Sequence, residues 1–374
     1  YTTLYHLIFI VKIKNNMSVC ILGGGLSSLT LAKALVNQKI YVDVKDSVNS
    51  FQLEKSRTIG ISKSNLDFFN KYIINIDKIT WKLRQIHIFS DSLKKEKLLN
   101  FENSKNQLFS ILKNYQLYNI LENSLKKNKY FKKINLKREK NYFENYDIVI
   151  VTDYLSPIAK KYFNKQIVKK YNSFAYTTII EHKKILNDIA TQIFTKDGPL
   201  AFLPVSSNKT SIVYSINNSN LIYSERIKDL IHNYNFKYKI NKINKIESFE
   251  LKSFNLRSYY YNKFLAFGDL LHRIHPLAGQ GFNMTIRDIK IFLNLIKNRA
   301  NLGLPIDKSI NSEFENKTKH TNFIFANGID LIHEFFNLEK KIKNDTLSKS
   351  IQLLGKNPSI NKVFTTLADK GILI

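Results

Sequence analysis

Residues 18–46, SVCILGGGLSSLTLAKALVNQKIYVDVKD, decide the fold of this chain. A short apolar run, residues 18–22, ends at three consecutive glycines. Residues 26–37 then repeat apolar side chains at helical spacing, and residues 40–44 form a second apolar run. Strand, glycine turn, helix and strand in this order predict the βαβ start of a dinucleotide-binding domain.

The glycine turn has the chemistry that a pyrophosphate requires. Gly23 and Gly25 permit a tight turn and a close approach of the backbone to a ligand at the helix N-terminus. Ser28 is a small residue at the third glycine position of the G-x-G-x-x-G pattern, and Asp46 follows Gly25 by 21 residues, where a carboxylate can accept hydrogen bonds from a ribose. A tight turn without any ligand is the alternative interpretation.

A second stretch, FLAFGDLLHRIHPLAGQGFNMTIRD (residues 264–288), has the same character. It predicts a strand ending at Gly268-Asp269, then a loop that holds His272, His275 and Pro276. A glycine-framed turn, residues 278–281, then opens a helix that continues to residue 297. The free N–H groups of a helix start favour an electron-rich ligand.

The remaining chain alternates between predicted helices and strands. A helix is predicted near Ser224–Asn233, inside a strand-rich region that spans residues 172–254. The other predictions are an amphipathic helix (65–72), strands (79–100), a helix (107–125), a lysine-rich solvated connection (126–141), a buried strand (146–151), a helix (311–337) and a helical tail (338–374).

Composition narrows the class of protein. The chain has 374 residues and a formal net charge of +28, from 50 Lys and 8 Arg against 30 acidic residues. The lysines are spread along the chain and Arg is scarce, which argues against nucleic-acid binding and is compatible with attraction to an anionic membrane surface. Cys20 is the only cysteine, so the sequence provides no intrachain disulfide and no cysteine metal site.

No apolar run is long enough to span a bilayer. Residues 1–16 are apolar in part but lack the basic region and cleavage site of a signal peptide, and Met17 directly precedes the first predicted strand. We therefore treat residues 1–16 as upstream sequence or an extra edge segment.

The glycine-rich βαβ unit and the distant GDLLHRIHPLAGQGFNMTIRD together resemble the FAD-dependent aromatic hydroxylases. Within this group they are most similar to the ubiquinone-biosynthesis (UbiH/VisC-like) hydroxylases, over about residue 17 to the C-terminus. The segments RTIGISKSNLDFF, GPLAFLPV and NGIDLIHEFF add to the resemblance.

The resemblance implies an α/β fold: a discontinuous Rossmann-like FAD-binding domain, an inserted β-sheet substrate domain and C-terminal helices. The FAD-binding domain would consist of residues 17–75, 101–165 and 255–330. The substrate domain would consist of residues 76–100 and 166–254, and the helical tail of residues 331–374.

The resemblance also implies the roles of single residues and assigns no catalytic one. The pyrophosphate would lie on Gly23, Gly25 and Ser28, the adenosine ribose on Asp46, and the ribityl chain on Asp269 beside Gly268. Arg57 would lie on the flavin side and Asp153 near both FAD and NAD(P)H. The flavin ring would be surrounded by Pro276, Gly279, Gln280, Gly281 and Asn283.

The implied reaction is hydroxylation of a polyprenylated phenol in ubiquinone biosynthesis, through NAD(P)H-reduced FAD and a C4a-hydroperoxide in a dry pocket. Two departures from the family pattern leave alternatives open: Tyr154 replaces the glycine after Asp153, and Tyr115 replaces an arginine. The alternatives are a hydroxylase of a soluble aromatic compound and a degenerate FAD-binding subunit of a biosynthetic complex.

The expected location is cytoplasmic or peripheral on the inner membrane, with a hydrophobic quinone precursor as the substrate and no nucleic-acid partner. His272 and His275 are spaced as metal ligands could be, but Asp269 is the only nearby carboxylate that the sequence offers in a predicted loop. We therefore expect loop histidines with a structural role and no metal; a catalytic histidine is the alternative. We expect His182 to lie on a sheet.

Overall fold

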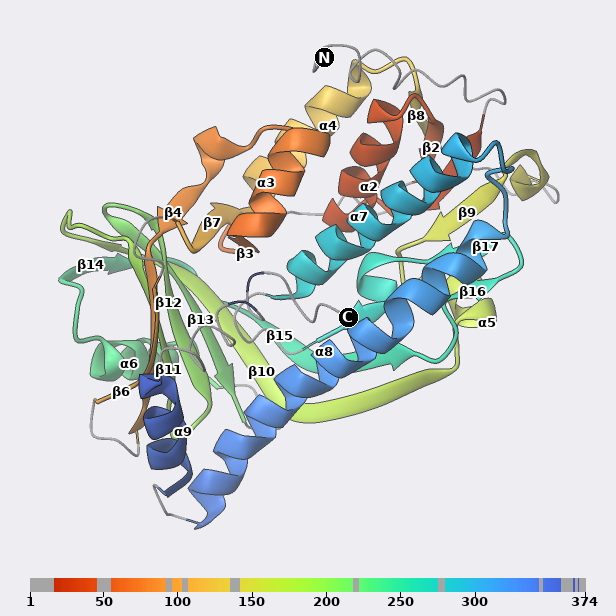
Figure 1. Ribbon diagram of the computed structural model, residues 1–374. Helices are drawn as coiled ribbons and strands as arrows, with labels where there is room; N and C mark the ends of the chain where they lie inside the picture. Colours follow the sequence, from red (N-terminus) through yellow and green to blue (C-terminus); the bar gives the residue numbers. More distant parts are fainter. Residues whose placement is uncertain are drawn as a thin grey trace.

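A computed structural model describes residues 17–45, 55–91, 96–102, 107–134, 142–217, 222–274, 280–342 and 346–357, together with Thr366 and Asp369. One body of helices and a sheet contains residues 17–45, and a second body is built around a broad sheet beside it (Figure 1). Within these residues, no helix combines the length and apolar character needed to cross a membrane.

The first body contains a six-stranded sheet in the order β16-β17-β9-β1-β2-β8. Neighbouring strands are parallel except β16 and β17. The strands are β1 (Ser18–Leu22), β2 (Tyr41–Lys45), β8 (Phe131–Ile134), β9 (Ile148–Val151), β16 (Tyr260–Tyr261) and β17 (Phe264–Ala266).

The order of the five parallel strands creates a switch point between β1 and β9. Numbered along the chain, they run 3-2-1-4-5, so the connections leave β1 in opposite directions. Both strands are mainly apolar, and all of their residues except Ser18 are buried, which is typical of central parallel strands. A ligand of such a sheet binds at the carboxyl ends of the strands at this point.

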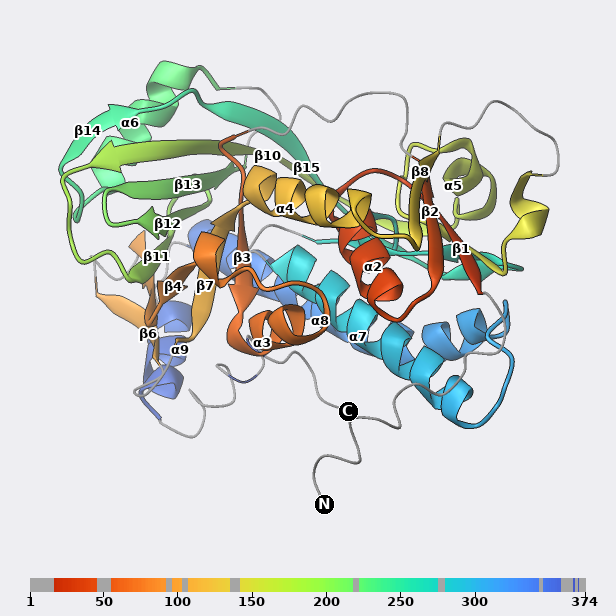
Figure 2. The ribbon, with the colours of Figure 1, turned by 90° about the horizontal axis from the view of Figure 1, so that it is seen from above.

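Helices cover this sheet and pack against one another. The helix α2 (Leu26–Asn37) packs on β1 and β2 and contacts α4 (Asn114–Lys126) and α7 (Gln280–Asn301). The long α8 (Ile310–Ile342) runs beside α7, as both views show (Figures 1 and 2). Two shorter helices, α3 (Lys63–Tyr72) and α5 (Pro157–Tyr162), complete the first body.

The second body is a nine-stranded sheet in the order β18-β15-β10-β13-β12-β11-β5-β6, with β14 paired to β10. The helix α6 (Ser224–Tyr234) buries Ile227 and Ile231 against it, and α9 (Thr346–Lys356) packs on β6. The strands are β5 (Gln85–Ser90), β6 (Lys97–Glu102), β10 (Gln166–His182), β11 (Ile189–Phe194), β12 (Pro199–Ser206), β13 (Lys209–Ile216), β14 (Ile240–Ile243), β15 (Glu247–Leu256) and β18 (His272–Arg273).

Two features join the bodies. The 17-residue strand β10 extends from the broad sheet to the first body, with its pairing to β15 interrupted near Asn172, which has φ 49°. A small antiparallel sheet, in the order β3-β7-β4, contacts α7 on one side and β12 on the other. Its strands are β3 (Thr58–Ser62), β7 (Phe109–Lys113) and β4 (Trp81–Leu83).

The structure confirms the predicted βαβ unit, the strand at residues 146–151 and the helix near residues 224–233. His182 ends β10, as expected of a residue on a sheet.

Outside the candidate site, two predictions of secondary structure were wrong. Residues 109–113 are strand β7, not the start of a helix, because β3 and β4 pair on its two edges and bury its side chains. The lysine-rich connection contains β8, which pairs with β2. Its Lys132 and Lys133 are exposed, as is usual on an edge strand.

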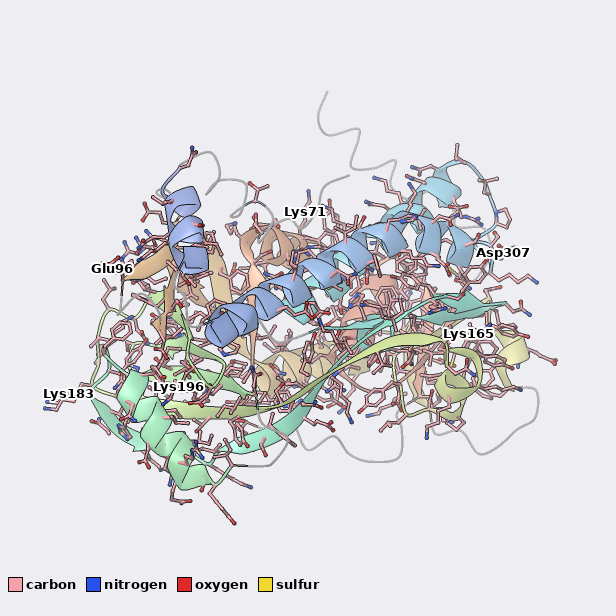
Figure 3. The ribbon with its side chains drawn as sticks, turned by 90° about the horizontal axis from the view of Figure 1, so that it is seen from below. Lys71, Glu96, Lys165, Lys183, Lys196 and Asp307 are labelled. Atoms are coloured by element: carbon pink, nitrogen blue, oxygen red, sulfur yellow. The ribbon has the colours of Figure 1, made fainter. Side chains whose placement is uncertain are left out.

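The lysines are distributed over both bodies. Lys71, Lys165, Lys183 and Lys196 are exposed and lie in different parts of the molecule (Figure 3). Exposed positive charge is therefore present on both bodies.

Candidate functional site

The start of α2 presents free backbone N–H groups at the end of β1. No side chain caps this helix, and its first turn contains no acidic residue. A Cβ atom added at Gly25 would meet no atom within 4 Å, so the space beside the turn is open. An uncapped helix start beside open space, at the switch point, fits a phosphate group.

Gly23 lies in the crowded part of the same turn. Its φ is 132°, and a Cβ atom there would lie 2.2 Å from Thr152 Oγ1. Thr152 directly follows β9 and its hydroxyl lies 2.6 Å from that of Ser28, in a buried hydrogen bond. The same hydroxyl donates to the Leu22 carbonyl over 3.1 Å. Thr152 thus joins the end of β9 both to the end of β1 and to α2.

Ser28 has a structural explanation in these contacts. It is fully buried, and its side chain faces the protein. Any contribution of Ser28 to a ligand would come from its backbone N–H group in the first turn of α2. Sequence reasoning missed Thr152; the rule that parallel strands end at one edge of a sheet could have identified it.

The two glycine-containing stretches meet directly. Gly268 has φ 60°, and a Cβ atom there would lie 2.6 Å from the Cβ of Ser27, in the first turn of α2. Only glycine fits this approach without movement. Asp269 follows and is exposed, and no described residue donates a hydrogen bond to its carboxylate. Residues about 240 positions apart in the sequence therefore line one edge of the sheet.

The helix α7 begins at Gln280 and is anchored by Asn283. The Asn283 side chain is fully buried; its Oδ1 accepts from the Ser62 N–H at 3.0 Å and from Asn65 Nδ2 at 2.9 Å. Its Nδ2 donates to the Gly60 carbonyl over 2.9 Å. These bonds fix the start of α7 against β3.

Gln280 and Gly281 lie in the first turn of α7. Gln280 is buried and accepts from Arg287 at 3.4 Å, while a Cβ atom added at Gly281 would meet no atom within 4 Å. Burial lowers the pKa of Arg287 to about 10, against the opposing effects of Asp288 and Asp369. Its guanidinium lies over the ring of Phe325.

Arg57 lies between the two bodies. Its guanidinium carbon is 4.6 Å from the centre of the Phe249 ring on β15, a cation–π contact. Its carbonyl accepts from the N–H of Asn114, the first residue of α4. Arg57 is thus held at the junction of the broad sheet and the helices of the first body.

Asp153 follows Thr152 at the carboxyl end of β9. Its carboxylate accepts from the Leu155 N–H at 2.9 Å, which forms a local turn before α5. Tyr154 is 44% exposed and its ring contacts Arg273 and Phe254. Where the family pattern has a glycine, this chain places an aromatic ring near β18 and β15.

His272 does not lie in a loop. It is part of β18, is buried, and its Nε2 lies 2.7 Å from Oδ2 of Asp288 on α7. Asp288 also accepts from Asn322 on α8 at 3.1 Å. The expectation that Asp269 was the only nearby carboxylate was wrong, because α7 brings Asp288 beneath β18. The expected structural role agrees with this buried connection.

Several predicted site residues lie outside the described residues: Asp46, His275, Pro276 and Gly279. Among the residues that the structure describes, no three His, Cys, Asp or Glu side chains form a group that could hold a metal ion. Cys20 is buried in β1, and burial raises the pKa of its thiol to about 12, so it is protonated at neutral pH.

The sequence matches to known proteins include several ubiquinone-biosynthesis hydroxylases. No family model matches the chain. It is 28% identical over 161 residues to 3-demethoxyubiquinol 3-hydroxylase of Escherichia coli (strain K12), which covers 40% of this chain and 40% of that protein. It is 21% identical over 260 residues to the mitochondrial ubiquinone biosynthesis monooxygenase COQ6 of Drosophila melanogaster, covering 58% and 54%. The chain thus covers about half or less of these relatives' length, and the matches confirm the resemblance.

Solved structures match over almost the whole chain. p-Nitrophenol 4-monooxygenase PnpA from Pseudomonas putida DLL-E4 has a TM-score of 0.75 at 11% identity, covering 95% of this chain and 100% of that one. HpxO of Klebsiella pneumoniae, complexed with FAD and uric acid, has a TM-score of 0.74 at 12% identity, covering 96% and 99%. At these identities the likeness shows the fold, and it confirms the predicted fold class.

Proposed function

We propose that the chain is an FAD-dependent monooxygenase that hydroxylates the aromatic ring of a polyprenylated phenol, a ubiquinone precursor. The observation that carries the proposal is the direct approach of Gly268 to Ser27, at the switch point of the parallel sheet. It places both glycine-containing stretches at one edge, where an extended dinucleotide can contact them together. The names of the sequence relatives supply the substrate class.

The described residues fit the phosphate end of FAD. The backbone at Gly23 and Gly25 and the uncapped N–H groups of α2 would hold the pyrophosphate. Asp269, exposed next to Gly268, has a carboxylate free to accept hydrogen bonds from the hydroxyl groups of the ribityl chain. We extend the proposal to Asp46, which would hold the adenosine ribose.

The flavin end would lie between the start of α7 and Arg57. The α7 N-terminus carries partial positive charge, which favours negative charge on a ligand ring placed before it. Asn283 orients this helix start through its bonds to β3, and Arg57 adds a fixed cation. We propose that Gln280, Gly281, Pro276 and Gly279 surround the ring. FAD, when bound, supplies the redox and oxygen chemistry.

The rest of the chain would bind and shield the substrate. We propose that residues 76–100 and 166–254 form the substrate domain, a division supported by the membership of β5 and β10 to β15 in one sheet. An apolar substrate tail lies in a membrane, so a basic protein would act at its surface, peripherally on the inner membrane or within a biosynthetic complex.

One observation favours a second candidate, an FAD-binding subunit without turnover. The Tyr154 ring contacts Arg273 of β18 and Phe254 of β15, at the position where the family pattern has a glycine. The neighbouring Asp153 is the residue that the resemblance links to NAD(P)H. Such a protein would bind FAD but would not accept electrons from NAD(P)H.

The test is to purify the protein, record its flavin absorbance, and follow NAD(P)H oxidation with and without a prenylated phenol. Yellow protein whose NAD(P)H oxidation is stimulated by the prenylated phenol, with hydroxylated product, supports the proposal. Stimulation by a soluble phenol alone points to a hydroxylase of soluble aromatics, and yellow protein without oxidation points to the second candidate. Colourless protein that cannot be reconstituted with FAD refutes both.

A further inference from the structure

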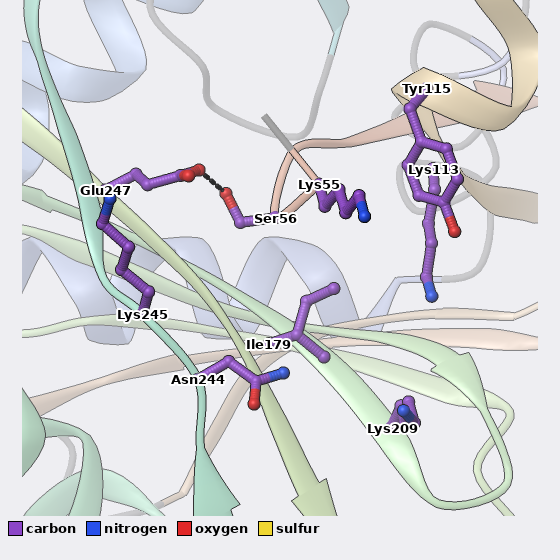
Figure 4. A pocket seen from close by; sticks show the side chains of 9 residues that line it. All are labelled: Lys55, Ser56, Lys113, Tyr115, Ile179, Lys209, Asn244, Lys245 and Glu247. Atoms are coloured by element: carbon purple, nitrogen blue, oxygen red, sulfur yellow. Dashed lines mark hydrogen bonds between the residues drawn. The ribbon is translucent and has the colours of Figure 1, made fainter. Parts of the chain in front are cut away.

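A basic pocket lies at the junction of the two bodies, apart from the α2 turn. Its volume is about 230 Å³, and Figure 4 shows Lys55, Lys113 and Lys209 on one side and Lys245 and Glu247 on the other. The lining comes from the residues before β3, the β7–α4 junction, β10, β13 and the residues entering β15. It is completed by Ser56, Tyr115, Ile179 and Asn244.

The positive charge in this pocket exceeds the negative charge. Glu247 is the one acidic lining residue, and its carboxylate accepts from the hydroxyl of Ser56. Lys209 pairs with Glu181 at 3.0 Å. No ion pair joins Lys55, Lys113 or Lys245 to an acidic residue in the described part of the chain. Lys55, Lys113 and Lys245 therefore line one small space without an ion-pair partner among the described residues, and Lys55 and Lys245 are also exposed to solvent.

The charge of Lys113 is held in the pocket at an energetic disadvantage. Burial, and then the charge of Lys209, lower the pKa of Lys113. Lys113 is also the residue before α4, a helix with no side-chain cap and no acidic residue in its first turn. Like charges beside a helix N-terminus disfavour each other, and an anion placed among them would relieve this repulsion.

We propose that this pocket binds the phosphate groups of a small anionic molecule, and that the nicotinamide dinucleotide of the proposed reaction is their source. Lysine ammonium groups bind phosphates as point charges, and several can share one diphosphate. The assignment to a dinucleotide rests on the proposed function. The pocket adjoins Arg57 through Lys55 and Ser56, so a dinucleotide anchored here would lie beside the flavin end of the FAD site.

The experiment measures binding to FAD-loaded protein by titration calorimetry at low ionic strength. The probes are inorganic pyrophosphate, NAD⁺ and NADP⁺, which bind without turnover. The variants are Lys113→Gln and Lys245→Gln, with Lys183→Gln as the matched control because Lys183 is exposed and lies outside the pocket. Each pocket variant should weaken pyrophosphate and dinucleotide binding about tenfold, a free-energy change of about 1.4 kcal/mol. The control should change it less than twofold.

The outcomes separate this proposal from the proposed function. Pyrophosphate that does not bind, or that binds equally to all variants, overturns the pocket as a phosphate site. Pyrophosphate binding that depends on the two lysines, with dinucleotide binding that does not, overturns the dinucleotide as the source. The pyrophosphate titration can also be run on FAD-free protein, so a failure to bind FAD would refute the proposed function without deciding the pocket.

Discussion

Two alanine substitutions in one turn should separate folding from cofactor binding. Gly23→Ala places a Cβ atom 2.2 Å from Thr152 Oγ1 and 3.1 Å from Ser28 Oγ, at a backbone φ of 132°. Gly25→Ala places a Cβ atom in open space, at an ordinary φ of −79°. The two positions are two residues apart and differ in what surrounds them.

The expected magnitudes follow from these surroundings. A non-glycine residue in the sparsely populated φ region costs about 1–3 kcal/mol. Displacing Thr152 weakens its hydrogen bond with Ser28, which contributes about 1 kcal/mol. Gly23→Ala should therefore lower the free energy of unfolding by about 2–4 kcal/mol. Gly25→Ala replaces glycine by alanine at a helix N-cap and should cost about 0.5–1 kcal/mol.

The Gly25→Ala substitution should weaken FAD binding more than it destabilises the fold. The added methyl group meets no protein atom, so it occupies the space that the proposed pyrophosphate needs. FAD affinity should fall at least tenfold, about 1.4 kcal/mol, while the fold is retained. Urea unfolding of FAD-free protein measures the free energy of unfolding, and flavin fluorescence titration measures the affinity for FAD.

Two results would refute this reasoning. If Gly23→Ala unfolds at the same urea concentration as the wild type, the crowding of Gly23 against Thr152 is not as the structure describes. If Gly25→Ala binds FAD with unchanged affinity, the open space beside the α2 turn is not the pyrophosphate site.

Three further substitutions test other parts of the structure. Asn283→Ala should destabilise the protein by about 2–3 kcal/mol, because it leaves buried backbone groups of β3 without partners; urea unfolding measures this, and an unchanged midpoint contradicts the anchoring role. Asp288→Ala should cost about 3 kcal/mol by removing the buried partner of His272, and a loss under 0.5 kcal/mol would show that the pair is not formed. The raised pKa of Cys20 contributes stability that is complete below about pH 9 and is lost as the pH rises towards about 12, since the unfolded thiol ionises first. Wild type should therefore lose about 1 kcal/mol relative to Cys20→Ala between pH 9 and 10, and parallel pH profiles of the two would contradict the burial.

Local patterns predicted the first body well because its elements carry strong signals. The run at residues 18–22, the glycines and the periodic residues 26–37 agree with one another, and the structure forms each element there. The same reasoning failed at residues 109–113, where a short apolar run fits either a helix or a strand. The neighbouring strands β3 and β4 decide that case, and neither adjoins it in sequence.

In the candidate site, the sequence likewise predicted single residues but not the contacts between them. Gly268 was expected near the ligand, but the sequence does not contain the reason that it must be glycine, which is the Ser27 side chain 2.6 Å from a Cβ position. The sequence did not identify Asp288 as the partner of His272, because the two residues meet only where α7 packs against β18. The lysines of the basic pocket belong to segments between residues 55 and 245 and looked like ordinary surface charge.

The sequence by itself determined the class of the protein: a parallel α/β sheet beginning with a glycine-rich βαβ unit, and two helix starts suited to an electron-rich ligand. These features depend on residues close together in the chain, so periodicity and turn chemistry suffice to predict them. Only the tertiary structure decided which residues meet, such as Ser28 with Thr152, Ser27 with Gly268, and Lys113 with Lys209. Contacts of this kind follow from the order of strands in the sheets and the packing between them, and no local stretch of sequence specifies that order.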